Sequence, residues 1–128
     1  MIYLDTSVAL AHLLAEDRFP DAALWRESLV ASRLLEYECW TRLHARKLGS
    51  SHGDRLRELL ARVAFLELTP IVLARATEPF PVAVRTLDAL HLSSLLFLRE
   101  RGVGLALATY DERLRGAARR LGVEIASL

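Results

Sequence analysis

The chain has 128 residues, of which 52% are hydrophobic and 26% charged, with a mean hydropathy of +0.22 and a net charge of +1. This composition excludes a disordered chain, and the length suits a single domain, residues 1–128, with a substantial core. No apolar stretch approaches the roughly 20 residues of a membrane helix, and the single cysteine, Cys39, excludes an internal disulfide. We therefore expect a cytoplasmic protein without a membrane attachment.

The predicted elements alternate between strands and helices along the chain. Short apolar runs predict strands at residues 2–4, 30–32, 65–68, 105–108 and 123–125. Apolar residues at helical spacing predict helices at residues 7–15, 21–29, 34–47, 54–63, 70–77, 87–101 and 112–121. Thr86 is the expected cap of the 87–101 helix, and GSSHG at 49–53 resembles a turn. This alternation favours a parallel sheet with helices on both faces, so we expect a three-layer α/β domain of about five strands.

The basic residues are almost all of one kind. Sixteen of the 17 are arginine, and Lys47 is the only lysine. Arginine binds phosphate groups through a planar fork of donors, so an arginine-rich surface suits a nucleic-acid ligand. Genomic base composition produces the same bias, and both explanations stay open at this point.

Four carboxylates stand at positions that favour chemistry when they are taken together. Asp5 and Asp111 each follow a predicted strand, Asp88 lies in the first turn of the 87–101 helix, and Glu38 lies inside the 34–47 helix. Alone, each has a structural explanation: helix N-termini favour acids, and Glu38 has Arg42 as its i+4 partner. Together, acids at neighbouring strand ends share one crevice, and hard divalent cations such as Mg²⁺ bind clustered oxygens. Such cations activate water for attack on a phosphodiester.

Several segments resemble those of one family. The segments DTS at 5–7, SRLLEYE at 32–38, RTLDALHLSS at 85–94 and ATYDERLRGAARRLG at 108–122 resemble PIN-domain ribonucleases, most closely the VapC-type toxins of bacterial toxin–antitoxin pairs. The resemblance spans essentially the whole chain. It implies a parallel five-stranded sheet in the order 3-2-1-4-5 and an endoribonuclease that uses Mg²⁺ or Mn²⁺. It also implies a homodimer, to which Tyr37 and Trp40 are suited, and a small antitoxin partner encoded beside the toxin.

The resemblance also assigns site residues. It places the metal-binding, catalytic acids at Asp5, Glu38, Asp88 and Asp111, with supporting hydroxyl groups at Thr6 and Thr109. Glu36 is the alternative to Glu38, because the two point about 160° apart on a helix and only one can face the crevice. The spacing that the family shows from its serine, here Ser32, implies Glu38. Arginines beside the acids, at Arg85, Arg113 and Arg115, are candidate contacts for RNA phosphates, with solvated side chains or local ion pairs as the alternative.

Two other functions share some of these features. A receiver-type phospho-acceptor domain also has acids at strand ends, but it needs a lysine at a late strand end, and Lys47 follows a helix. A stand-alone or non-catalytic PIN-like module that binds or processes RNA is the other alternative; degenerate members typically lose acids, whereas all four matched positions are filled here. His91, one turn beyond Asp88, is expected to be a hydrogen-bonded packing residue rather than a catalytic base.

Overall fold

The computed structural model describes all 128 residues, and it contains a five-stranded parallel sheet. The strands are β1 Ile2–Leu4, β2 Leu29–Ser32, β3 Val63–Leu66, β4 Ala106–Ala108 and β5 Glu124–Ile125. Their order is β3-β2-β1-β4-β5, and every neighbouring pair is parallel. The expected α/β class and the expected strand order are both confirmed.

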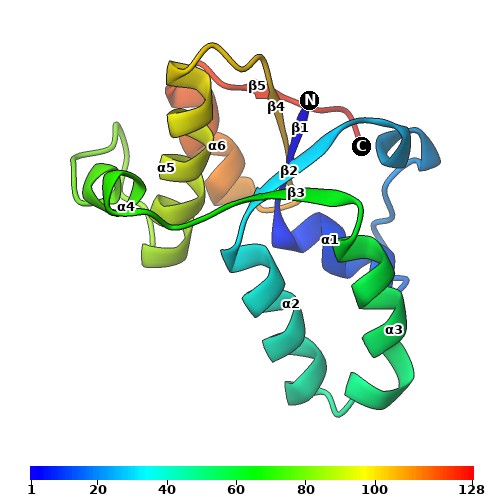
Figure 1. Cartoon of the computed structure of the whole chain (residues 1–128). Coiled ribbons are helices and arrows are strands. Elements are labelled where there is room, and N and C mark those ends of the chain that lie inside the picture. Colours follow the sequence, from blue (N-terminus) through cyan, green and yellow to red (C-terminus); the bar gives the residue numbers. More distant parts are fainter.

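Helices cover both faces of this sheet (Figure 1). They are α1 Thr6–Leu13, α2 Leu34–Ala45, α3 Gly49–Leu60, α4 Pro70–Ala76, α5 Thr86–Glu100 and α6 Glu112–Arg120. One core lies between the sheet and α1, α2 and α3, and a second lies between the sheet and α5 and α6. Alternate strand residues supply the two cores: Tyr3 packs into the second and Leu4 into the first, because successive side chains of a strand point to opposite faces. None of the helices is both long and apolar enough to cross a membrane.

Two local predictions, the helix at 21–29 and the cap at Thr86, differ from the structure. The helix expected at 21–29 is only a short 3-10 turn, Ala22–Arg26, because Leu29 already belongs to β2 and pairs with Ile2. Asp21 does cap this turn, its carboxylate accepting from the backbone N–H of Ala23 at 2.8 Å. Thr86 is the first residue of α5 and not its cap, which is Arg85.

The segment at 49–53 is helical and not a turn. The chain reverses earlier, where Lys47 has a φ of 57°, and α3 then begins at Gly49, five residues before the expected start. Gly53 lies against the Trp40 ring, and a Cβ built on this glycine would be 3.3 Å from the nearest ring atom. The absence of a side chain at Gly53 therefore permits close packing of α2 and α3. The helix also ends earlier than expected, at Leu60 instead of residue 63, and β3 begins at Val63 instead of residue 65.

The chain order of the strands creates the place for a ligand. From β1 the chain runs outward to β2 and β3, then returns to add β4 and β5 on the other side of β1. In open α/β sheets, a crevice forms beyond the carboxyl ends of the two strands where the order reverses. Here those strands are β1 and β4, which are followed by Asp5 and by Thr109–Asp111.

Candidate active site

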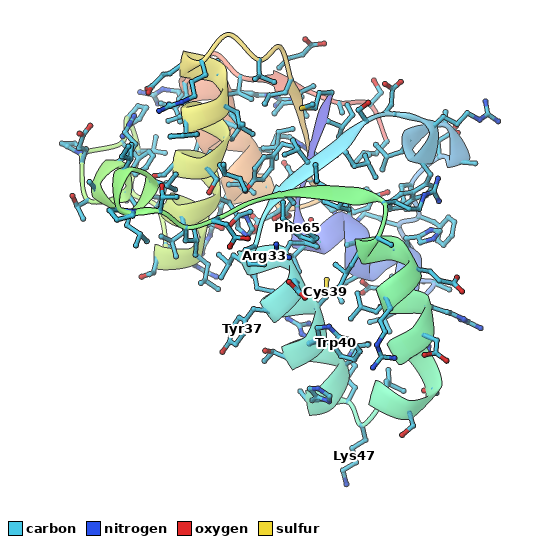
Figure 2. All side chains as sticks on the ribbon, viewed as in Figure 1. Arg33, Tyr37, Cys39, Trp40, Lys47 and Phe65 are labelled. Carbon is cyan, nitrogen blue, oxygen red and sulfur yellow. The ribbon has the colours of Figure 1, made fainter.

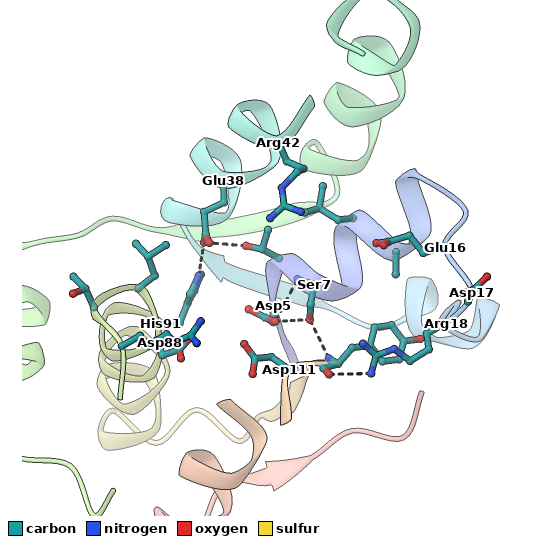
Figure 3. A pocket seen from close by; sticks show the side chains of 17 residues that line it. Asp5, Ser7, Glu16, Asp17, Arg18, Glu38, Arg42, Asp88, His91 and Asp111 are labelled. Carbon is teal, nitrogen blue, oxygen red and sulfur yellow. Dashed lines mark hydrogen bonds and ion pairs between the residues drawn. The ribbon is translucent and has the colours of Figure 1, made fainter. Parts of the chain in front are cut away.

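A cavity of about 810 Å³ lies at this crevice, and it is lined mainly by polar side chains (Figure 3). The four carboxylates expected at the site, Asp5, Glu38, Asp88 and Asp111, all line it. They come from the end of β1, from α2, from α5 and from the start of α6. The fold thus brings together acids that are up to 106 residues apart in the sequence. We call this cavity the acidic pocket.

Asp5 is held by several donors at the bottom of the acidic pocket. It is 6% exposed and caps α1, and its Oδ2 accepts from the backbone N–H of Ser7 at 3.3 Å. The same oxygen accepts from the hydroxyl groups of Ser7 at 2.5 Å and Thr109 at 2.8 Å. Asp5 therefore caps α1 as the structural explanation expected, and its second oxygen remains available on the side of the cavity.

Glu38 is held from two sides. Its Oε1 accepts from the Thr6 hydroxyl at 3.0 Å and contacts Nε2 of His91 at 2.6 Å. On the far side of the imidazole, Nδ1 lies 3.0 Å from the Tyr3 hydroxyl, which accepts from the backbone N–H of Ser32 at 3.2 Å. A chain of hydrogen bonds therefore runs from β2 through the second core to Glu38.

His91 is buried and hydrogen-bonded, as expected, but it also lines the acidic pocket, which the sequence did not indicate. Burial by itself lowers the pKa of His91. The hydrogen bond to Glu38 and the negative charges of Asp5, Glu38 and Asp88 outweigh burial, so the net pKa is raised. The imidazole is therefore held in an environment that favours its positive charge.

The two glutamates of the SRLLEYE segment have different surroundings. Glu36 forms an ion pair with Arg33 at 2.9 Å on the outside of α2, and it does not line the acidic pocket. Glu38 lies inside it, and its bonds go to Thr6 and His91 rather than to Arg42. The geometry therefore favours Glu38 over Glu36 as the residue facing the site, and the surface ion pair with Arg42 does not form.

Asp88 and Asp111 close the acidic pocket on the side of the second core. Asp111 caps α6, because its Oδ1 accepts from the backbone N–H groups of Arg113 at 2.9 Å and Leu114 at 3.2 Å. The Asp88 carboxylate makes no hydrogen bond within the protein; burial, together with the charges of Asp111 and Asp5, raises the pKa of this carboxyl group. Thr109 joins the two ends of the site, since its hydroxyl donates to Asp5 and accepts from the Asp111 N–H at 2.9 Å.

Only one of the three arginines proposed as phosphate contacts borders the acidic pocket. Arg85 lines it, whereas Arg113 and Arg115 do not. The Arg115 guanidinium is bound to Glu112 at 2.6 Å and to the carbonyl oxygen of Thr109 at 2.9 Å, so it supports the backbone beside the site. The residues that sequence reasoning missed on this rim are Arg18 and Arg42.

The donor set fits a hard divalent cation that is bound mostly through water. No three His, Cys, Asp or Glu side chains lie close enough together to form a ready-made ligand cluster. In Asp5, Glu38 and Asp111, however, one carboxylate oxygen makes all the bonds to the protein, and the second remains available. Mg²⁺ usually binds in this way, through one or two carboxylates and several waters. The pKa of Asp88 is raised first by burial and then by the negative charges of Asp111 and Asp5, and a bound cation would offset that charge.

The fold and this site agree with the comparisons to known proteins. The family model of the PIN domain matches residues 2–120, and the chain belongs to the PIN-domain family. Within that family it is similar to "Ribonuclease VapC46" of Mycobacterium tuberculosis (strain ATCC 25618 / H37Rv), at 36% identity over 129 residues, which covers 97% of this chain and 95% of the relative. "Ribonuclease VapC47" of strain CDC 1551 / Oshkosh is 31% identical over 134 residues, with 99% and 96% covered. The resemblance read from the sequence is confirmed.

A solved structure extends the comparison beyond these bacterial relatives. The crystal structure of PAE2754 from Pyrobaculum aerophilum superposes with a TM-score of 0.61 at 25% sequence identity. The superposed region covers 91% of this chain and 79% of the PAE2754 chain. The similarity in fold therefore extends over most of the chain.

Proposed function

We propose that this protein is a metal-dependent endoribonuclease that hydrolyses RNA phosphodiester bonds and acts as the toxin of a type II toxin–antitoxin pair. The observation that carries the proposal is the acidic pocket, in which four carboxylates from four elements meet at the strand-order switch. The names of the VapC relatives support a ribonuclease, and the hard oxygen donors support Mg²⁺ or Mn²⁺.

Asp5, Glu38, Asp88 and Asp111 would hold the metal, directly or through waters. When bound, such an ion activates water and offsets the charge that develops on the phosphodiester. The remaining residues hold these ligands in place: Thr6 and His91 orient Glu38, while Ser7 and Thr109 orient Asp5. Arg85, Arg18 and Arg42 line the rim of the acidic pocket and supply positive charge for RNA phosphates.

Partners and location complete the proposal. A small antitoxin encoded beside the gene binds and neutralises the protein, which works in the cytoplasm as a homodimer. A small adjacent reading frame with a DNA-binding N-terminal half would support the toxin role; its absence would favour the stand-alone PIN nuclease.

The receiver-type alternative has no support in the structure, because Lys47 lies in the turn between α2 and α3 (Figure 2) and does not line the acidic pocket.

The test compares the two glutamates of α2, which differ in their surroundings and not in their chemistry. With Mg²⁺ or Mn²⁺ the parent should cleave RNA, and excess EDTA should stop cleavage. Glu38→Gln should lose more than the roughly 10–100-fold that is typical when only a residue supporting a metal ligand is removed. Glu36→Gln, the control on the outer face of the same helix, should cleave like the parent. Undiminished cleavage in EDTA, or equal losses in both variants, would contradict the mechanism.

A further inference from the structure

A second cavity continues from the acidic pocket along α6. It has a volume of about 710 Å³ and lies between the segment at 82–85 and one face of α6, and we call it the α6 groove. Arg85 and Asp88 line both the acidic pocket and the α6 groove, so the two are adjoining parts of one surface depression. A ligand that lies in the acidic pocket can therefore extend into the α6 groove.

The two cavities differ in charge. The acidic pocket contains all four carboxylates of the site, whereas the α6 groove is lined by Arg85, Arg113 and Arg120. These three arginines are exposed and form no ion pair in the structure. Of the two acids in the α6 groove, Glu112 is paired with Arg115, and Asp88 stands at the junction with the acidic pocket. Arginines without ion pairs therefore outnumber unpaired carboxylates in the α6 groove, whereas carboxylates outnumber arginines in the acidic pocket.

The floor of the α6 groove is apolar, and it contains an open space. Val82 and Val84 are half-buried against the second core, and Ala117 is buried within it. Gly116 lines the same cavity, and a Cβ built on it would meet no atom within 4 Å. The groove therefore combines apolar side chains and unfilled space beside Gly116 with the cationic side chains of its three arginines.

We infer that the α6 groove is a subsite for single-stranded RNA, in which Arg113 and Arg120 bind backbone phosphate next to the cleaved bond and the apolar floor receives a base. This inference rests on the proposed ribonuclease function. Single-stranded nucleic acids are bound by positively charged grooves that follow the backbone and by apolar surfaces that contact the bases. Both features are present here beside carboxylates suited to a metal ion.

Two arginines that are neighbours on α6 provide the test and its control. Arg120 lines the α6 groove, whereas the adjacent Arg119 is also exposed but does not line it. Binding of a short, labelled, single-stranded RNA of random sequence is measured by fluorescence anisotropy in the Glu38→Gln background, which prevents cleavage. Each lost phosphate contact should weaken binding about fourfold near physiological salt and reduce the slope of log affinity against log salt by about 0.7. Arg113→Gln and Arg120→Gln should show both effects, and Arg119→Gln neither.

A second pair of variants tests the space above the floor. Gly116→Leu should fill the groove and weaken RNA binding without changing the salt slope, because no charge is removed. Leucine is a better helix former than glycine, so the variant should fold, which a thermal melt checks. Gly104→Leu is the matched control, since Gly104 also has nothing within 4 Å of its Cβ position but lies outside both cavities. With Glu38 restored, the groove variants should raise KM and leave kcat nearly unchanged.

Other outcomes separate this inference from the function on which it rests. If the parent cleaves RNA but the groove variants behave like Arg119→Gln and Gly104→Leu, the subsite is wrong and the ribonuclease remains. If the variants lose binding of a labelled polyglutamate peptide but keep RNA, the α6 groove is a docking site for an acidic peptide, and the RNA subsite is again wrong. A parent that neither binds nor cleaves RNA overturns both proposals.

Discussion

Asp88 is a carboxylate of the acidic pocket whose ionisation lowers the stability of the metal-free folded protein. Burial comes first among the causes that raise its pKa, followed by the negative charges of Asp111 and Asp5. A carboxyl group with a raised pKa in the folded state favours unfolding once it is ionised. The destabilisation caused by ionised Asp88 is therefore absent below the ordinary pKa of about 3.9, where the group is protonated in both states. The free energy of unfolding falls as pH rises from there through the pKa of the folded state.

Asp88→Asn should thus raise the melting temperature in EDTA at neutral pH by a few degrees. The difference between variant and parent should shrink as pH falls through the pKa of Asp88. Added Mg²⁺ should raise the melting temperature of the parent more than that of the variant, because a ligand that binds only the folded state stabilises it. Thermal melts of both proteins with EDTA and with Mg²⁺ measure these differences.

The opposite result has an equally clear physical meaning. If Asp88 only supported the N-terminus of α5, removing its charge would cost about 0.3–1 kcal/mol. A variant that is less stable in EDTA and keeps the full Mg²⁺ response of the parent would return Asp88 to that structural role.

Helix geometry narrowed the choice between Glu36 and Glu38 but did not make it. Residues two apart on a helix face nearly opposite sides, so only one could face the crevice, and the family's spacing from Ser32 favoured Glu38, which is the one that lines the acidic pocket. The contribution of His91 could not be read in the same way. Its position one turn beyond Asp88 indicated a shared helix face, but its partners Tyr3 and Glu38 come from elements that only the fold brings together.

At the scale of the helix, Asp111 combines two roles that substitutions can separate. It caps α6 through Oδ1 and lines the acidic pocket. Asparagine caps a helix about as well as aspartate, whereas alanine loses about 0.5–2 kcal/mol at such a position. Asp111→Asn should therefore fold at least as stably as the parent and lose RNA cleavage. Asp111→Ala should lose cleavage and also be less stable than Asp111→Asn by about 1 kcal/mol.

Urea denaturation in EDTA measures the difference between the two variants, and cleavage of RNA with Mg²⁺ measures the shared loss. Glu112→Gln, at the first position of the same helix and with its side chain 73% exposed, is the control for removing a carboxylate from this helix end. Retained activity in Asp111→Asn would leave Asp111 with its capping role alone.

The elements were predictable where local signals agreed with packing, and they differed where packing decided. The segment at 49–53 has the composition of a turn, yet Gly49 and Gly53 both lie in α3. Within the helix, the missing side chain of Gly53 leaves room for the Trp40 ring. Leu29 has helical spacing with the residues before it, but it is buried in β2 between β1 and β3. Contacts between segments distant in sequence outweighed local preference in both places.

At the scale of the whole molecule, the surface retains large apolar side chains that one domain does not cover. Tyr37 on α2 is 66% exposed and points away from the core (Figure 2), while Ile71 and Leu73 on α4 are 62% and 42% exposed. Trp40, which was also expected to be available for a dimer contact, is only partly exposed. Its ring lies 5.0 Å from the Arg57 guanidinium and stacks on the His44 ring. Exposed apolar side chains of this size favour contact with another protein surface.

We therefore predict a homodimer at micromolar concentration, with Tyr37 and Ile71 contributing apolar contacts between the two copies. Tyr37→Glu and Ile71→Glu should each shift the protein towards monomer, because a charge would be buried in the contact without a partner. Phe19→Glu is the control, since Phe19 is 55% exposed but lies in the loop after α1, where its ring contacts the His12 ring with 5.3 Å between ring centroids. Light scattering over a range of concentrations measures the mass. A parent that is monomeric throughout contradicts the dimer, and a dimer insensitive to both charges places its contact on another face.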